Sequence, residues 1–250
     1  MNTIKHILTA ASLLFLFGNC NKENADATIN ISGAGGSTAR FTISGNYLYV
    51  VDHASLKSFQ VTDPQHTVFT SKVDVGVNIE TIFPYQDKLL IGSSQSMYIF
   101  SLTHPERPER IGKADYTVRM SCDPVIAVDS VAYATLNAQG PCGGSQSILA
   151  VYNIKNITAP VSMNALPLTA PFGLGMKGDA LYVCEGQGGL KIYDIHNRYA
   201  PSYISTISSD AFYDVIPYGN LLIAQVTGGV ALYDIGTNPF QPVLKSKILN

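Results

Sequence analysis

The sequence contains no tryptophan and is poor in charged residues. Only 14% of its 250 residues are charged, and 16 Lys and Arg nearly balance 18 Asp and Glu, which leaves a net charge of −2. No basic cluster offers an electrostatic footprint for a phosphate backbone, so we expect no nucleic-acid partner. Glycine (21), proline (13) and tyrosine (14) are plentiful instead. This composition favours β-structure with many turns.

Long hydrophobic runs are also missing, with one exception near the N-terminus. Residues 7–17 form an apolar run that follows Lys5 and His6. The run is too short to span a bilayer as a mature helix, but it has the length of a signal-peptide core. We therefore expect residues 1–19 to be a signal peptide.

A cysteine follows this apolar run, in a stretch that resembles a lipobox imperfectly. We expect lipidation of Cys20, followed by a flexible linker up to residue 38; cleavage after residues 25–27 ("ADA") is the alternative. The stretch "CNKEN" (residues 20–24) loosely resembles an export signal of some Gram-negative lineages. The predicted location is the outer membrane or cell surface through the N-terminal lipid, and otherwise the periplasm or the medium.

The rest of the chain is an internal repeat. Five stretches of the type "LKIYDIHNRYAP" end in a turn with proline, and their aromatic residues are spaced 41, 52, 41 and 40 residues apart. The five aromatic residues are Phe59, Phe100, Tyr152, Tyr193 and Tyr233. The period is therefore about 41 residues, with one insertion in the third unit. In the stretch at residues 189–201, this repetition predicts that Tyr193 packs a sheet and that Asp194 satisfies turn donors, so neither forms a site.

Each unit also carries a turn of the type "GNYLYV" or "GDALYV" and two further apolar stretches. Four short strands per unit of about 41 residues predict an all-β fold, a β-propeller of about five four-stranded antiparallel blades. The propeller should cover residues 39–250. The predicted repeats are approximately residues 39–75, 76–115, 120–165, 170–208 and 210–250. Residues 28–32 ("TINIS") remain an alternative source of a closing strand.

Several of these stretches carry a family resemblance. Residues 121–136, 141–154, 171–194 and 212–225 resemble the LVIVD-repeat proteins, a propeller-like family of surface and secreted proteins. The resemblance is close in the last three units and loose in the first two, where Phe replaces Tyr and the Asp is lost. It implies the fold, and it implies little about chemistry because the family is defined by its repeat.

Three cysteines lie in the predicted propeller. In an antiparallel blade, the start of the first strand and the loop between the second and third strands lie at the same end. This topology brings Cys122 and Cys142 together, and an exported protein permits a disulfide. A metal site is the alternative for this pair, but no CxxC spacing or adjacent histidine supplies the other ligands. Cys184 is expected to be a buried small side chain.

Catalytic motifs are hard to find. No G-x-S-x-G is present, and "GAGGS" (residues 33–37) lacks the lysine and helix of a phosphate loop. The absence of tryptophan argues against a quinoprotein-type oxidoreductase. His66, His104 and His196 follow equivalent turns of different units, so we expect surface turn residues there. No metal and no cofactor are expected, with calcium bound by acidic residues at the channel mouth as the alternative.

The best candidate for a site is the end of the blades that carries the loops before each first strand and between the second and third strands. Polar residues from several units converge there, and propeller ligands commonly bind at one mouth of the central channel. The predicted ligand-binding residues are His53, Glu80, Arg119, Asp123, Glu185, Tyr213 and Asp214. The expected function is a non-catalytic, lipid-anchored binding module for a glycan, peptide or protein. The alternative is a metal-assisted, lactonase-like hydrolase that uses carboxylates at the channel mouth.

Overall fold

The computed structural model describes residues 36–117, 124–139 and 146–249. The described residues belong to one compact unit, Ile31–Asn250. The predicted signal peptide and Cys20 lie outside the described residues. The regular elements described are twenty strands in five four-stranded antiparallel sheets. The predicted all-β, five-bladed propeller is confirmed. Within the described ranges, no helix is long and apolar enough to cross a membrane.

The strands follow the predicted units. The first sheet contains β1 (Phe41–Ser44), β2 (Tyr47–Val51), β3 (Ser55–Gln60) and β4 (Val68–Asp74), and the second contains β5 (Ile79–Tyr85), β6 (Lys88–Ser93), β7 (Ser96–Ser101) and β8 (Glu109–Asp115). The third contains β9 (Val125–Val128), β10 (Val131–Leu136), β11 (Ile148–Asn153) and β12 (Val161–Pro167). The fourth contains β13 (Leu174–Lys177), β14 (Ala180–Cys184), β15 (Leu190–Asp194) and β16 (Ser202–Ile207), and the fifth contains β17 (Phe212–Tyr218), β18 (Leu221–Val226), β19 (Gly229–Asp234) and β20 (Val243–Leu249).

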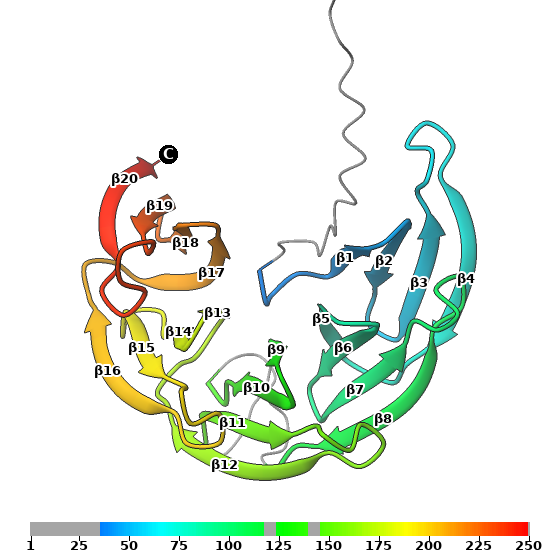
Figure 1. Cartoon of the computed structure of the whole chain (residues 1–250), viewed down its shortest axis with the longest axis horizontal. Helices are drawn as coiled ribbons and strands as arrows, with labels where there is room; N and C mark the ends of the chain where they lie inside the picture. The colour runs from blue at the N-terminus through cyan, green and yellow to red at the C-terminus, as the bar shows by residue number, and fades with distance from the viewer. Residues whose placement is uncertain (1–35, 118–123, 140–145, 250) are drawn as a thin grey trace, which may run out of the picture. The chain divides into compact units, whose positions relative to one another are not determined.

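Each blade is built from one contiguous stretch of chain. Within every sheet the strands pair in chain order, for example β1-β2-β3-β4. The first strands of the blades, β1, β5, β9, β13 and β17, lie nearest the centre, and the last strands lie outermost (Figure 1). Successive blades touch mainly through these inner strands, as in the contacts of β1 with β5 and of β13 with β17.

The turn between the first and second strands is the same in every blade. One residue of this turn has a left-handed backbone, with φ between 53° and 60°. The five residues at this position are Gly45, Gln86, Asp129, Gly178 and Gly219. Glycine adopts this conformation without steric cost, whereas a residue with a Cβ does so at a cost. The "GN" and "GD" dipeptides of the sequence therefore mark a conformational requirement that blades two and three meet with other residues.

Replacing Gln86 with glycine is expected to raise the free energy of unfolding by about 1 kcal/mol, because glycine relieves the left-handed strain. Chemical denaturation measures the change. Gly45→Ala is the matched control with the opposite sign: a Cβ at Gly45 would meet no atom within 4 Å, so its cost would be conformational. If Gln86→Gly destabilised the protein, the side chain of Gln86 would matter more than its backbone.

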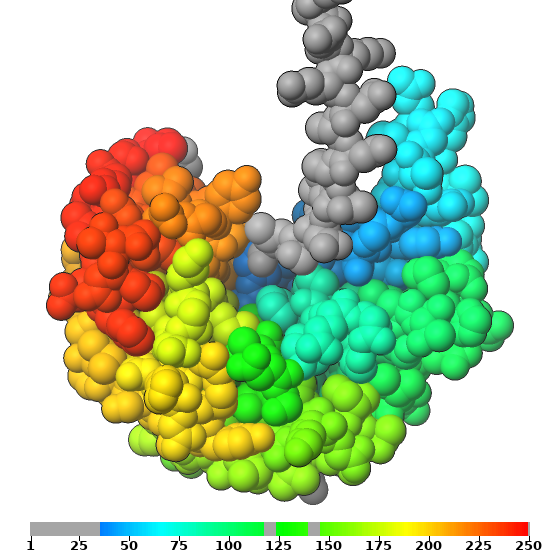
Figure 2. All heavy atoms as spheres, viewed as in Figure 1, coloured from blue at the N-terminus to red at the C-terminus, as the bar shows by residue number. Residues whose placement is uncertain are grey.

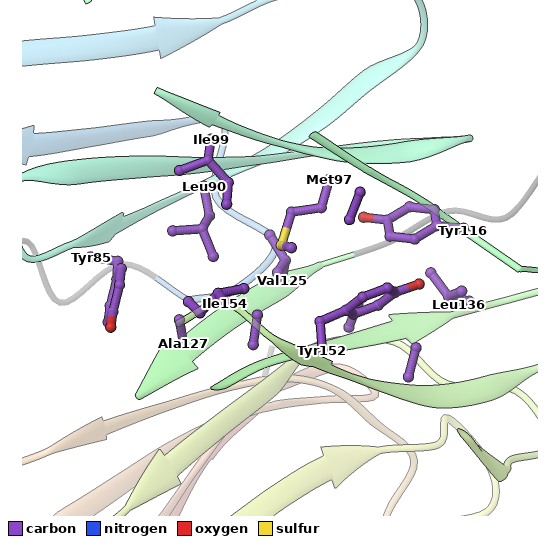
Figure 3. Close-up of a cluster of buried hydrophobic side chains, with 14 of the residues drawn as sticks. Tyr85, Leu90, Met97, Ile99, Tyr116, Val125, Ala127, Leu136, Tyr152 and Ile154 are labelled. Carbon is purple, nitrogen blue, oxygen red and sulfur yellow. The ribbon is translucent and has the colours of Figure 1, made fainter. Parts of the chain in front are cut away.

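The hydrophobic core lies between the blades. Four clusters of buried side chains are found in the described residues, and each is centred on one junction between successive blades. The cluster between the second and third blades joins Leu90, Met97 and Ile99 to Val125 and Ala127 from the next blade (Figure 3). A single sheet cannot bury both of its faces, so each blade depends on its neighbours.

Three tyrosines on second strands connect their blade to the next one by a hydrogen bond. The hydroxyl of Tyr49 donates to the carbonyl of Pro105 (2.9 Å), and that of Tyr182 donates to the carbonyl of Pro239 (2.6 Å). Tyr133 donates in the same way to Arg198 (2.8 Å). Burial raises the pKa of all three hydroxyls well above the ordinary value, so they remain protonated donors.

The first and last blades are the two ends of this series. No fifth hydrophobic cluster joins them within the described part of the chain. The orange and red atoms of the fifth blade stand apart from the cyan atoms of the first (Figure 2). Large apolar side chains stay exposed on both blades, among them Phe41 (63%) and Ile248 (63%). We call this boundary between β1–β4 and β17–β20 the seam.

The expected flexible linker up to residue 38 is too long by its last three residues. Ser37 is buried, with an exposure of 2%, and it is hydrogen-bonded to the fourth and fifth blades. The carbonyl of Ala39 then accepts from the amide of Ile82 in the second blade (2.9 Å). The glycines and serine of this segment led us to predict a flexible linker. Because these residues are small, the segment instead fits between the blades.

Other predictions for individual residues are confirmed. Tyr193 is buried in the core, and the carboxylate of Asp194 accepts from the turn amide of His196 (2.7 Å). Cys184 is fully buried, and burial raises the pKa of its thiol. The side chain of His196 is 87% exposed. The stretch at residues 189–201 is therefore part of the blade framework.

Candidate functional site

The predicted site lies at the end of the blades where each first strand begins. Of its residues, Arg119 and Asp123 lie outside the described residues, and so do Cys122 and Cys142, whose disulfide remains a prediction. The five others occupy the strand ends at this side of the fold.

His53 and Glu80 come from neighbouring blades. His53 is exposed in the hairpin between β2 and β3, and its carbonyl accepts from the amide of Ile79 (3.0 Å). Glu80, the next residue of β5, is half-buried. The backbone therefore brings these two predicted residues to adjoining positions.

Glu185 is a buried structural carboxylate. Its side chain is 2% exposed, and its Oε1 accepts from the amide of Thr169 (2.7 Å). Its Oε2 pairs with Nζ of Lys191 (2.6 Å). Both oxygens are thus engaged, and Glu185 joins the hairpin after β14 to the segment that precedes β13.

Polar residues at the equivalent hairpins of other blades have the same kind of role. Asp52 accepts from the amides of Ala54 (3.0 Å) and Ser55 (2.8 Å), and Asn137 accepts from the amide of Gln139 (2.9 Å). Such bonds satisfy the backbone of a tight turn. In the described ranges, no three His, Cys, Asp or Glu side chains gather as metal ligands would.

Tyr213 forms an aromatic pair with Phe172, a residue that is not among the predicted site residues. Its ring packs edge-on against Phe172, with centroids 5.2 Å apart and planes at 78°. The Tyr213 hydroxyl lies 3.3 Å from Oγ1 of Thr227. Phe172 is 36% exposed, a large value for a phenylalanine at the junction of two blades. We call Phe172 and Tyr213 the aromatic ledge.

The backbone of Phe172 in the aromatic ledge is fixed by hydrogen bonds. The amide of Phe172 donates to the carbonyl of Cys184 (2.8 Å), and its carbonyl accepts from Oγ1 of Thr135 (2.6 Å). A Cβ at Gly186 would lie 2.8 Å from the Phe172 ring, so glycine makes room for that ring. The sequence signal for this feature was weak, because a phenylalanine in "PFGLGMKGD" reads as a core residue.

Asp214 is buried and binds the N-terminal segment of its own propeller. Its Oδ2 accepts from Oγ1 of Thr38 (2.6 Å), and its Oδ1 accepts from Oγ of Ser37 (3.3 Å) and from the amide of Val215 (2.9 Å). Burial raises the pKa of the Asp214 carboxyl despite these bonds. Asp214 therefore links the chain segment before the first blade to the fifth blade.

The raised pKa of Asp214 gives a pH-dependent contribution to stability. Because the folded state holds this proton more tightly than the unfolded state, the contribution is fully present below the ordinary pKa of aspartate. It is lost as pH rises through the raised value. The free energy of unfolding of the wild type should therefore fall relative to that of Asp214→Asn as pH rises. Denaturation of both proteins over a range of pH measures this difference. A pH-independent difference would contradict the burial of an ionisable group there.

Comparisons with known proteins agree with the fold. Residues 35–74 match the family model of the LVIVD repeat. The match falls on the first unit, one of the two for which we expected only a loose resemblance. No curated protein matches the chain.

Solved structures match over most of the chain at 10–11% identity, which shows the fold alone. A candidate 6-phosphogluconolactonase from Bacteroides fragilis has a TM-score of 0.65 at 10% identity, over 84% of this chain and 69% of that one. The periplasmic gluconolactonase of Pseudomonas aeruginosa has a TM-score of 0.65 at 11% identity, over 82% and 68%. BamB from Moraxella catarrhalis has a TM-score of 0.54 at 11% identity, over 84% and 63%. The chain spans 60% of the computationally designed protein Ika8.

Proposed function

We propose that the protein is a non-catalytic binding module of the cell envelope, which takes a glycan, peptide or protein partner on the aromatic ledge. The observation that carries this proposal is the partly exposed, edge-to-face pair of Phe172 and Tyr213 at the predicted mouth of the channel. Aromatic side chains supply a large contact area, and tyrosine adds a hydroxyl for a polar contact. Little conformational entropy is lost on binding because the backbone of Phe172 is already clamped.

The engagement of the nearby carboxylates also supports binding over catalysis. Glu185 holds Thr169 and Lys191, and Asp214 holds Ser37 and Thr38. A general acid or base needs a carboxyl within hydrogen-bond reach of a substrate. The carboxylate oxygens of Glu185 and Asp214 instead contact other residues of the protein.

Glycan and peptide arrays probed with the wild type and with Phe172→Ser/Tyr213→Ser test this proposal. Signals on a defined glycan or peptide should fall at least tenfold in the double variant. Tyr203→Ser is the matched control, since Tyr203 is 56% exposed on the outer strand β16 and should leave binding unchanged. Equal loss in both variants, or binding that ignores the ledge, would refute the assignment.

A lactonase-like hydrolase is the second candidate. Two observations favour it: the buried Asp214 has a raised pKa, as general acids often do, and the fold resembles that of gluconolactonases. Hydrolysis of a sugar lactone, measured with and without added calcium, distinguishes the two functions. Turnover that is lost in Asp214→Asn, while the variant keeps its fold, would favour the enzyme.

We also propose that a lipid on Cys20 holds the propeller at the outer membrane or cell surface. The apolar run at residues 7–17 and the cysteine that follows it support this location. Fractionation of cells that express Cys20→Ser tests it, because the wild type should sediment with membranes and the variant should not. A wild-type protein in the soluble fraction would leave the periplasm or the medium as its location.

A further inference from the structure

The fifth blade presents a face that the other blades bury. The fourth residue after each left-handed turn residue packs against the next blade and is fully buried in the first four blades. These four residues are Tyr49, Leu90, Tyr133 and Tyr182. Their equivalent in the fifth blade is Ile223, which is only half-buried. The blade therefore carries an interface for which the described chain supplies no following blade.

A hollow lies on this face of the fifth blade. Its volume is about 590 Å³. It is lined by Asp214, Ile216, Ile223, Gln225, Val226, Gly228, Gly229, Val230 and Ile248. Five isoleucine and valine side chains from β17 to β20 make most of it apolar, and we call it the seam pocket. Burial of an aliphatic side chain in this apolar hollow would be favourable, because it removes apolar surface from water.

The described chain begins at the rim of the seam pocket. Gly36 lies against Asp214, so closely that a Cβ there would be 2.0 Å from Oδ2. Thr38 and Ser37 fix this position through their bonds to the same carboxylate. Gly36, the first described residue, therefore lies at the edge of the pocket.

We propose that Ile31 of the same chain inserts into the seam pocket. Ile31 is the first large apolar side chain before Gly36, and the intervening "SGAG" contains only small residues. Five extended residues reach at most about 18 Å, which is enough to cross a pocket that begins beside Gly36. Glycine and alanine allow the backbone to follow the sheet closely.

A segment of the same chain is favoured over a second copy because it is already tethered. A tether this short gives an effective concentration on the order of millimolar, which a second copy would have to exceed in free solution. Ile31 in the seam pocket would cover part of the exposed apolar face of the fifth blade. The proposal does not depend on the aromatic ledge, so failure of one leaves the other intact.

A photo-crosslinker at position 31 tests the proposal in the full mature chain. With p-benzoylphenylalanine in place of Ile31, illumination should join this position to peptides that contain Ile223 or Val230 within one chain. Mass spectrometry identifies the peptides, and gel mobility separates crosslinks within one chain from those between two. Crosslinks between two chains, or to other blades, would overturn the proposal.

Hydrogen exchange supplies a second measurement. Ile31→Asp should speed amide exchange in β18 and β19 at least fivefold, because a buried charge would expel the segment. Ile204→Asp is the matched control, since Ile204 is 46% exposed on β16 and should leave β18 and β19 unchanged. Unchanged exchange in Ile31→Asp would show that the seam pocket is open or is covered by something else.

Discussion

Tyr182→Ala is expected to lower the free energy of unfolding by about 3–5 kcal/mol, the largest effect of any single change considered for this fold. The side chain is fully buried at the junction of the fourth and fifth blades. Its removal leaves a cavity in that junction and takes away the donor for the carbonyl of Pro239. Denaturant unfolding, followed by circular dichroism, measures the loss.

Two controls separate packing from the hydrogen bond at Tyr182. Tyr182→Phe keeps the ring and should cost about 1 kcal/mol, the usual net contribution of one hydrogen bond. Tyr218→Ala removes a tyrosine that is 63% exposed on β17, and we expect a change within about 0.5 kcal/mol. If Tyr182→Phe were as damaging as Tyr182→Ala, the hydroxyl and not the buried ring would hold the junction.

Gly36→Ala should destabilise the protein by about 1–3 kcal/mol, and Asp214→Ala should cancel most of that penalty. The three atoms nearest to the new Cβ all belong to the side chain of Asp214, with Oδ2 at 2.0 Å and Cγ at 2.8 Å. Once Asp214 is shortened, the clash disappears. A double-mutant cycle on the free energy of unfolding therefore gives a coupling of similar size to the penalty.

Gly173→Ala tests the geometry of the same contact. Its Cβ would also meet the Asp214 carboxylate, at 2.1 Å from Oδ1, but in addition the backbone Cα of Asp214 at 2.8 Å. Asp214→Ala should rescue this variant only in part, because the backbone contact remains. Equal rescue of both glycine variants would mean that the backbone shifts freely, and additive effects at Gly36 would mean that it does not touch Asp214.

The repeat made the fold predictable from sequence. Phe59, Phe100 and their counterparts fix the period, and alternation fixes the strands, because the same junction is built again in each unit. Positions that serve this framework were read correctly for the same reason, as Tyr193 and Asp194 show. A sequence repeat does not show how its first and last units meet, so the seam between the first and fifth blades could not be predicted.

The candidate site was harder to predict, because a polar residue at a loop looks the same whether it is free or engaged. Asp214 is bound by Ser37, a residue 177 positions earlier in the chain. No local pattern reveals a contact of that separation, and the glycines beside Ser37 suggested a linker. Phe172 was not among the predicted site residues, because nothing in the local sequence distinguishes a partly exposed phenylalanine from a buried one.

The contact between Asp214 and Ser37 changes the way the blades depend on one another. Sheets that each use a contiguous stretch, and that touch only their neighbours, behave as a linear array whose end units open most easily. A hydrogen bond from the chain entering the first blade to the fifth blade joins the two end units. Local unfolding of either the first or the fifth blade then breaks the hydrogen bonds between Asp214 and Ser37 and Thr38. The two terminal blades are therefore expected to unfold cooperatively, although they are not neighbours in the chain.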